Sequence, residues 1–170
     1  PGSPQNAARL LEKEGVENYM ILIGGEVVVK GVNQNGVCWR TGINLPEDDP
    51  DGIKNNYDEI VQLCKKGAIA TSGNYRNFYI KDGKKYAHTI DPRTGYPAEQ
   101  SVLSATIVAN DCMTADAYAT AFMAMGLEKA RQMADSLPEI EYYVIYADEN
   151  GKHQIEYSKG MLQYLPKRKQ

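Results

Sequence analysis

The stretch SVLSATIVA at residues 101–109, followed closely by TADAYATAFMAM at residues 114–125, decides the fold class. The first segment is rich in β-branched residues and predicts a β-strand. The second predicts a helix, in which Thr114 can cap the first free amides and Gly126 can end the last turn. A strand that leads directly into a helix predicts a fold that mixes the two.

Around this pair the sequence predicts mostly short strands. Residues 5–15 predict the end of a helix that stops at Gly15. Residues 57–64 fit a short helix or a strand, of which we favour the strand. Asp82-Gly83 predicts a hairpin, because Gly accepts a positive φ. The other predicted strands are residues 18–23, 26–30 (continuing extended after a break at Gly24-Gly25), 37–43, 68–71, 76–80 and 85–90.

On the C-terminal side, residues 127–136 predict a second helix that ends before Pro138, and residues 142–147 and 153–157 predict a last hairpin. The sequence therefore predicts a single domain, residues 1–170, of class α+β, with a mainly antiparallel sheet and helices packed on one side. We interpret residues 1–4 as an expression scar or the start of a trimmed fragment, so we expect the native N-terminus and its targeting signal to be missing.

Composition excludes some classes of protein. The 19 Lys plus Arg and 22 Asp plus Glu give a formal net charge of −3, whereas a nucleic-acid-binding protein needs a basic face. Anionic phosphates must then be met locally, by a metal or a single Arg. The three cysteines, Cys38, Cys64 and Cys112, form no C-x-x-C pair, so no zinc site is predicted. We expect them to be small buried hydrophobes, with at least one thiol free because their number is odd.

Residues 88–95, HTIDPRTG, place a His, an Asp and an Arg on one tight corner. Pro92 fixes φ and Gly95 permits a positive φ, so the corner is rigid. A histidine exchanges protons near neutral pH, and an arginine offers a planar fork to phosphate oxygens. The alternative is a hairpin whose polar residues cap their own backbone, and spacing alone favours that alternative.

Asp116 and Thr120 are four residues apart on the predicted helix, which places both side chains on one face. A carboxylate and a hydroxyl are hard oxygen ligands of the kind Mg²⁺ accepts, with water or substrate phosphate completing the set. The surrounding alanines allow a bulky group to approach. The alternative is a buried helix whose Asp favours the macrodipole and whose Thr bonds to its own backbone.

Two further segments are candidates for ligand contact. Gly24-Gly25-Glu26 follows an apolar strand, and paired glycines let a backbone lie against a flat ligand. The commoner alternative is a bulge or bend inside a strand. Residues 71–75, TSGNY, predict a polar turn after a strand, which either bonds a ligand or merely ends the strand.

Taken together, four segments in this order resemble the ApbE family, the FAD:protein FMN transferases formerly labelled thiamine biosynthesis lipoproteins. The segments are IGGE at 23–26, ATSGNY at 70–75, HTIDPRTGYP at 88–97 and TADAYAT at 114–120. The third and fourth are specific, and the resemblance covers nearly the whole chain up to about Tyr157. It implies an ApbE-like fold of which this chain is the C-terminal part.

The resemblance implies a Mg²⁺-dependent transfer of FMN from FAD to a threonine hydroxyl of an acceptor flavoprotein subunit, with release of AMP. It implies that Asp116 and Thr120 ligate the metal and that His88 is the base near the transferred phosphoryl group. Asp91 matches the same turn motif, in part as a structural residue. The residues implied to line the cofactor site are Gly24, Gly25, Glu26, Thr71, Ser72, Gly73 and Arg93.

Other readings stay open at this point. Some family members hydrolyse FAD to FMN and AMP, so an FAD pyrophosphatase is an alternative, and so are a non-catalytic flavin-binding fragment and a folding domain without ligand affinity. The resemblance implies relatives roughly twice as long, with further flavin contacts and a backbone carbonyl ligand to the metal before Pro1. It also implies an extracytoplasmic protein, attached to a membrane only through a lipid anchor that this chain lacks.

Overall fold

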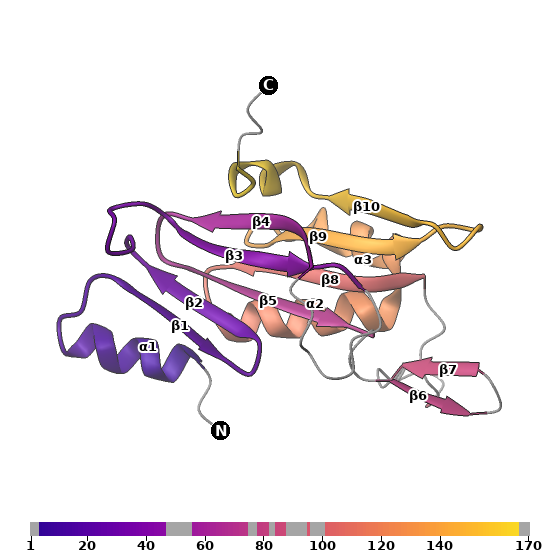
Figure 1. Cartoon of the computed structure of the whole chain (residues 1–170), viewed down its shortest axis with the longest axis horizontal. Helices are drawn as coiled ribbons and strands as arrows, with labels where there is room; N and C mark the ends of the chain where they lie inside the picture. Colours follow the sequence, from indigo (N-terminus) through magenta and orange to yellow (C-terminus); the bar gives the residue numbers. More distant parts are fainter. Residues whose placement is uncertain are drawn as a thin grey trace.

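The computed structural model describes residues 4–46, 56–74, 78–81, 84–87, 95 and 101–166. Six strands form one antiparallel sheet in the order β1-β2-β5-β8-β9-β10 (Figure 1). Two pairs of strands, β3–β4 and β6–β7, form separate two-stranded sheets that are not hydrogen-bonded into this one. The strands are β1 (Tyr19–Ile23), β2 (Glu26–Lys30), β3 (Trp39–Asn44), β4 (Tyr57–Leu63), β5 (Gly67–Gly73), β6 (Phe78–Lys81), β7 (Lys84–Ala87), β8 (Val102–Ala109), β9 (Glu141–Ala147) and β10 (His153–Tyr157).

The α-helices cover one face of this sheet, which confirms the predicted α+β class (Figure 1). They are α1 (Pro4–Lys13), α2 (Cys112–Met125) and α3 (Leu127–Ala134), and a short 3₁₀ helix, η1 (Lys159–Gln163), follows β10. Small side chains such as Ala115 and Ala119 let α2 approach the sheet closely, and both are fully buried. Within the described residues, no helix is long and apolar enough to cross a lipid bilayer.

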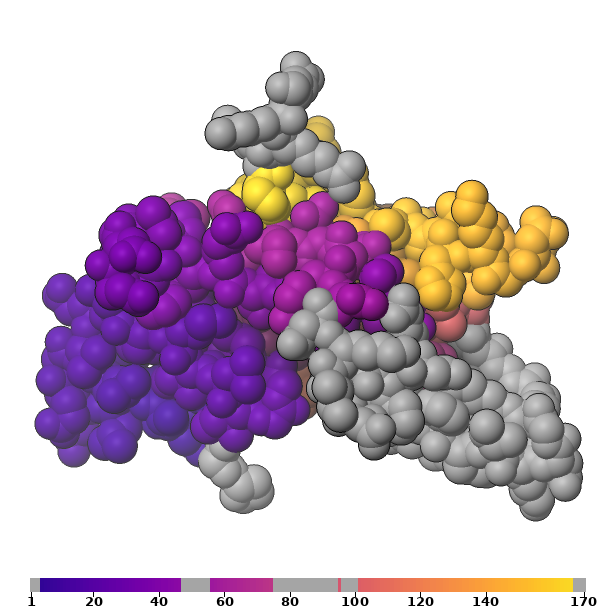
Figure 2. Space-filling model, viewed as in Figure 1, coloured from indigo at the N-terminus to yellow at the C-terminus, as the bar shows by residue number. Residues whose placement is uncertain are grey.

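A two-stranded hairpin, β3–β4, covers the opposite face of the sheet, as Figure 2 shows for the middle of the molecule. The indole nitrogen of Trp39 donates to the Lys30 carbonyl at 3.0 Å, which ties the hairpin to β2. The Gln62 amide donates to the Tyr164 carbonyl at 2.7 Å, which ties its other edge to the segment after η1. Between the two layers lie apolar residues of both, including Val27, Ile43, Val61, Leu63, Ile69, Val108 and Ile145.

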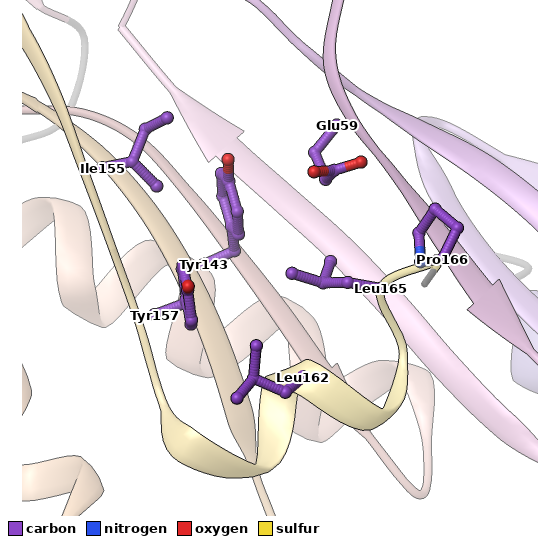
Figure 3. Close-up of a pocket in the computed structure, with 7 residues that line it drawn as sticks. All are labelled: Glu59, Tyr143, Ile155, Tyr157, Leu162, Leu165 and Pro166. Atoms are coloured by element: carbon purple, nitrogen blue, oxygen red, sulfur yellow. The ribbon is translucent and has the colours of Figure 1, made fainter. Parts of the chain in front are cut away.

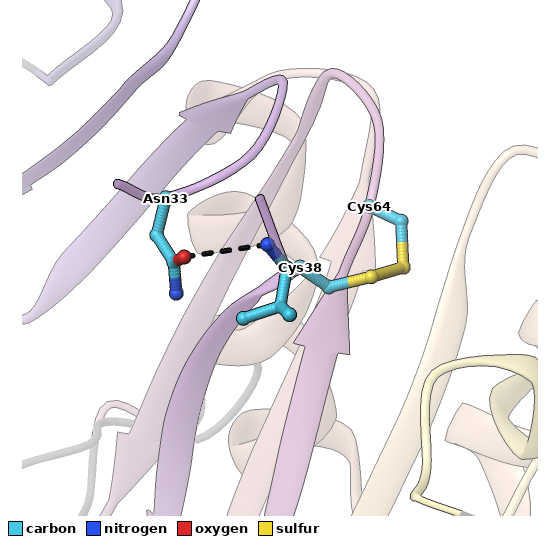
Figure 4. The surroundings of a disulfide bond; sticks show 4 residues. Asn33, Cys38 and Cys64 are labelled. Carbon is cyan, nitrogen blue, oxygen red and sulfur yellow. Dashed lines mark hydrogen bonds between the residues drawn. A yellow bond between two sulfur atoms is a disulfide. The ribbon is translucent and has the colours of Figure 1, made fainter. Parts of the chain in front are cut away.

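Two cysteines staple this hairpin. Cys38 and Cys64 form a disulfide just beyond the Trp39–Leu63 pair, where β3 begins and β4 ends (Figure 4). Our expectation that they are small buried hydrophobes is therefore wrong, and Cys64 is exposed. It is correct for Cys112, which is a buried free thiol.

The Gly24-Gly25 pair is a hairpin turn, so the alternative of a bulge or bend inside one strand does not hold, whereas residues 26–30 are extended as predicted. β1 and β2 are antiparallel, and Ile23 pairs with Glu26 across the two glycines. Their φ angles are 69° and 104°. Positive φ at both central residues is what a tight two-residue hairpin requires, and glycine supplies it without steric cost.

Asp111, and not Thr114 as predicted, is the N-cap of α2. Its carboxylate accepts from the Thr114 amide at 2.9 Å and from the Thr114 hydroxyl at 2.8 Å. The Cys112 amide donates to the side-chain oxygen of Gln5 at 3.2 Å, so α1 also helps to satisfy the free amides. Gly126 ends the helix with a φ of 80°, as predicted. Both ends of α2 are thus capped, and its start is also bonded to α1.

Candidate functional site

Ser72 and Thr120 meet on the helix-covered face of the sheet. The Oγ of Ser72 on β5 lies 3.3 Å from the Oγ1 of Thr120 on α2. Residues 71–73 are part of β5 and pair with residues 104–106 of β8, so the predicted polar turn is wrong. Two sequence segments that predict ligand contacts, 48 residues apart, therefore contribute hydroxyls to one place.

Strand alternation separates the other two residues of the TSG segment from Ser72. Successive side chains of a strand point to opposite faces. The Thr71 hydroxyl accordingly lies 2.8 Å from that of Thr106, its partner across the β5–β8 ladder. Thr106 is completely buried, whereas Thr71 is exposed. Of this segment, only Ser72 directs its side chain towards α2.

Asp116 and Thr120 lie on the exposed side of α2, as their spacing predicts. Both are exposed, and so is Ala117 between them, whereas Ala115 and Ala119 face the sheet. The helix therefore presents a carboxylate and a hydroxyl with the small Ala117 between them. This side of α2 is open to a ligand, and the alternative of a fully buried helix does not hold for these two residues.

Three carboxylates gather around the first turn of α2. Burial, and after it the negative charges of Glu26, Asp116 and Asp111, raise the pKa of the Cys112 thiol to about 11. The thiol is thus protonated at neutral pH and is no nucleophile. Glu26 is two residues before Val28, which packs with Cys112 of α2, so its side chain is on the helix-covered face of β2. Asp116 is on the exposed side of α2, so both carboxylates are on the helix side of the sheet. Their negative charges favour a cation there and oppose a bare phosphate.

The glycine turn lies beside Glu26. A Cβ placed on Gly24 would come within 2.9 Å of a Glu26 carboxylate oxygen, so this carboxylate folds back over the turn. On Gly25 a Cβ would meet nothing within 4 Å, so its surroundings are open. The predicted contact of both glycines with a flat ligand stays a prediction, because the hairpin itself already accounts for their positive φ.

The predicted corner at residues 88–95 lies largely outside the described residues. This applies to His88, Asp91 and Arg93, whose proposed roles rest on the sequence alone. Gly95 is described, and its φ of 73° agrees with the prediction that it adopts a left-handed conformation.

A family model supplies the first comparison with known proteins. The ApbE family model matches residues 4–144, a range that includes all four motif segments. The chain belongs to the ApbE family. This range also contains β1, β2, β5, β8 and α2, on which the described candidate residues lie.

Named relatives agree with this assignment to the ApbE family. The chain is 44% identical over 129 residues to a FAD:protein FMN transferase of Vibrio cholerae, which covers 76% of this chain and 37% of the relative. It is 40% identical over 126 residues to the FAD:protein FMN transferase of Escherichia coli K12, at 74% and 34% coverage. The chain thus spans little more than a third of the length of these curated relatives.

Solved ApbE structures share the fold. The flavin transferase ApbE of Vibrio cholerae superposes with a TM-score of 0.77 at 39% identity, over 93% of this chain and 48% of that one. The ApbE protein of Thermotoga maritima gives a TM-score of 0.77 at 30% identity, over 96% and 50%. The α+β architecture is therefore that of the ApbE family.

The donor set on α2 fits a hard divalent cation. Within the described residues, no group of three or more His, Cys, Asp or Glu side chains is placed to hold a metal. A Mg²⁺ site does not need one, since Mg²⁺ usually takes one or two carboxylates and completes its shell with water and substrate phosphate. Asp116 and Thr120, both open to solvent, offer one carboxylate and one hydroxyl, and the negative potential around Glu26 adds to the attraction.

A cavity of about 500 Å³ lies on the other face of the sheet (Figure 3). Tyr143, Ile155 and Tyr157 form its wall, and the rings of Tyr143 and Tyr157 stack with centroids 5.9 Å apart. Glu59 of β4 and Leu162 and Leu165 near η1 complete it. Because it opens on the hairpin side, at β9 and β10, it is separate from Ser72, Asp116 and Thr120.

Proposed function

We propose that this chain carries part of the active site of a Mg²⁺-dependent FAD:protein FMN transferase. The reaction moves FMN from FAD to a threonine hydroxyl of an acceptor flavoprotein and releases AMP. One observation carries the proposal: Ser72, Glu26 and Asp116–Thr120 come from three distant segments that match the family motifs, and they lie on the helix-covered side of the sheet.

Asp116 and Thr120 are the residues that would hold Mg²⁺. When bound, the metal neutralises charge on the phosphates, which makes a pyrophosphate open to attack. The carboxylates around the first turn of α2 would by themselves repel such a substrate, so these residues and a cation act together. The exposure of both side chains leaves room for phosphate oxygens and water.

The acceptor threonine needs a base because a hydroxyl is a weak nucleophile. In the proposed step its oxygen attacks the phosphorus of the FMN half of FAD. The bond from that phosphorus to the bridging oxygen breaks, and AMP leaves with that oxygen. His88 is proposed to take the hydroxyl proton, as its place in the motif suggests. Arg93 and the glycines of the β1–β2 turn are proposed to contact the cofactor.

The disulfide supports an extracytoplasmic location as part of the proposal. Disulfides persist in oxidising compartments and are rare in the cytosol. Cys38 and Cys64 are bonded to each other in the folded chain, and Cys64 is exposed to whatever reductant surrounds it. Attachment to a membrane through a lipid anchor is proposed from the family resemblance alone.

The test is Asp116→Ala, assayed for AMP release from FAD with Mg²⁺ in a form of the protein extended to the length of its relatives. We expect turnover to fall about a thousand-fold, because the carboxylate that holds the charge-neutralising metal is gone. Glu128→Ala, an exposed carboxylate of α3, is the matched control and should leave turnover unchanged.

The products decide the reaction type. AMP together with a flavinylated acceptor identifies the transferase, and AMP with free FMN identifies a pyrophosphatase. Binding of FAD without release of AMP would identify a non-catalytic flavin-binding fragment. Undiminished turnover in Asp116→Ala would remove the metal assignment.

A further inference from the structure

We propose that Ser72 is a positioning residue for Thr120: the Ser72 oxygen accepts the hydrogen of the Thr120 hydroxyl and so directs an oxygen lone pair of Thr120 towards the metal that Asp116 helps to hold. The inference rests on the proposed function, because it needs Thr120 to be a ligand. It gives the Ser72 side chain a role different from that of lining the flavin site.

The Thr120 hydroxyl is free to take this role. A hydroxyl has one hydrogen and two lone pairs. A threonine within a helix often donates its hydrogen to the carbonyl four residues earlier, and that carbonyl belongs here to Asp116. Among the described residues, the Thr120 hydroxyl is instead bonded to Ser72. The contact of this hydroxyl is therefore with the sheet and not with its own helix; either oxygen can donate in it, and the proposal assigns the hydrogen to Thr120.

Ser72 is held where such an acceptor is needed. Its position in β5 is fixed by the ladder with β8, in which it pairs with Ala105. The buried Ala115 and Ala119 bring α2 close to the sheet. Ser72 is half-buried, whereas Thr120 is exposed. A half-buried acceptor behind an exposed hydroxyl is the arrangement by which outer residues orient metal ligands.

The length of the contact agrees with orientation more than with a strong bond. At 3.3 Å the two oxygens are farther apart than the roughly 2.7–2.8 Å of an ordinary bond between hydroxyls. A ligand oxygen on a cation becomes a better donor, since the cation withdraws electron density from it. The contact is thus one that binding of a cation would strengthen.

The experiment measures binding of Mn²⁺, as a spectroscopic substitute for Mg²⁺, to the same extended form of the protein in the presence of saturating FAD, by electron paramagnetic resonance of the free ion. We expect Ser72→Ala to weaken Mn²⁺ binding about tenfold, the lower end for an outer residue of a metal site. Ser72→Thr keeps an oxygen on the strand and should restore the affinity. Ser104→Ala is the control, because this buried serine of β8 has no hydrogen-bond partner within the described residues and should leave the affinity unchanged.

The deciding measurement is Ser72→Ala in a Thr120→Val background. If Ser72 acts through Thr120, Ser72→Ala causes no further loss of Mn²⁺ affinity in the Thr120→Val background. An equal loss in both backgrounds would mean that Ser72 contacts the cation or FAD itself, and would overturn the inference. Loss of affinity in Asp116→Ala but not in Ser72→Ala would overturn the inference and leave the proposed function standing. If the unmodified extended protein binds Mn²⁺ no better than its Asp116→Ala variant, the metal site of the proposed function fails, and the inference with it.

Discussion

The two faces of the six-stranded sheet are covered in different ways. On one face three α-helices pack against the strands, with alanines, Phe122 and Met123 buried between the layers. On the other face the cover is largely the β3–β4 hairpin and η1. An isolated two-stranded hairpin is at best marginally stable in water, whereas packed helices add several turns of apolar surface. The hairpin face is the one that carries the disulfide.

The two faces also differ in how their polar side chains are bonded. On the helix face, hydrogen-bonded ion pairs such as Arg131–Glu156 join the elements that lie away from the candidate site. The candidate site itself has exposed polar groups and a hydroxyl–hydroxyl contact of 3.3 Å. On the hairpin face, two hydroxyls are bonded within the protein: Thr106 bonds Thr71, and Tyr143 donates to Asp58. The helix face is the one on which a hydroxyl and a carboxylate of the motif segments, those of Thr120 and Asp116, are exposed.

The largest expected effect concerns the disulfide. Replacing Cys38 and Cys64 together by Ser should lower the free energy of unfolding by about 3.5 kcal/mol, the chain-entropy value for a loop of this length. The two residues are 26 apart in sequence. Urea unfolding measures the loss, and amide hydrogen exchange should quicken more in β3 and β4 than in α2. Cys112→Ala is the control for loss of a thiol. Equal quickening on both faces would contradict the contrast drawn between them.

A smaller effect is expected on the helix face at Glu156. Its carboxylate accepts from Arg131 at 2.8 and 2.6 Å and from the Tyr142 hydroxyl at 3.2 Å, which joins α3, β9 and β10. Glu156→Ala should cost about 1.5 kcal/mol, since the pair is partly screened by solvent. Arg131 keeps the pKa of Glu156 below its ordinary value, so this stabilisation is present above that value and is lost as the pH falls through the lowered pKa.

Glu128→Ala is the matched control, because Glu128 meets the same Arg131 at 3.0 Å but is 71% exposed. Glu128→Ala should lower the free energy of unfolding by only about 0.3 kcal/mol. Urea unfolding of both variants at pH 7 and pH 3 tests the prediction. If Glu156→Ala and Glu128→Ala lower the free energy of unfolding equally, the half-buried network of Glu156 does not stabilise this end of the helix face.

Local signals predict much of this fold. The strand and helix at residues 101–125 and the hairpin at 142–157 follow from composition and breakers, with ends close to those observed. The spacing of Asp116 and Thr120 correctly predicts their common face. These features depend on neighbours within a few residues, whose preferences agree with the final structure.

Long-range pairing could not be predicted in this way. Nothing in the spacing of Cys38 and Cys64 tells that they face each other, since that depends on the register of β3 against β4. The neighbourhood of Ser72 and Thr120 depends on β5 pairing with β8 and on α2 folding back over both. Thr114 can cap a helix by its residue type, but Asp111 three residues earlier offers a carboxylate to the same turn.

The smallest effect tests whether the start of α2 holds the helix face in place. Asp111→Ala should cost about 1 kcal/mol in urea unfolding at pH 7, because the Thr114 amide loses its acceptor. Asp111→Asn keeps an acceptor oxygen and should cost little. The Thr114 amide holds the pKa of Asp111 below its ordinary value, so the extra stability of the carboxylate is present above that value and disappears as the pH falls through the lowered pKa. The difference in free energy of unfolding between the unmodified chain and Asp111→Asn should therefore shrink between pH 7 and pH 2. A difference that is the same at both pH values would show that the charge of Asp111 has no part in capping the helix that carries Asp116.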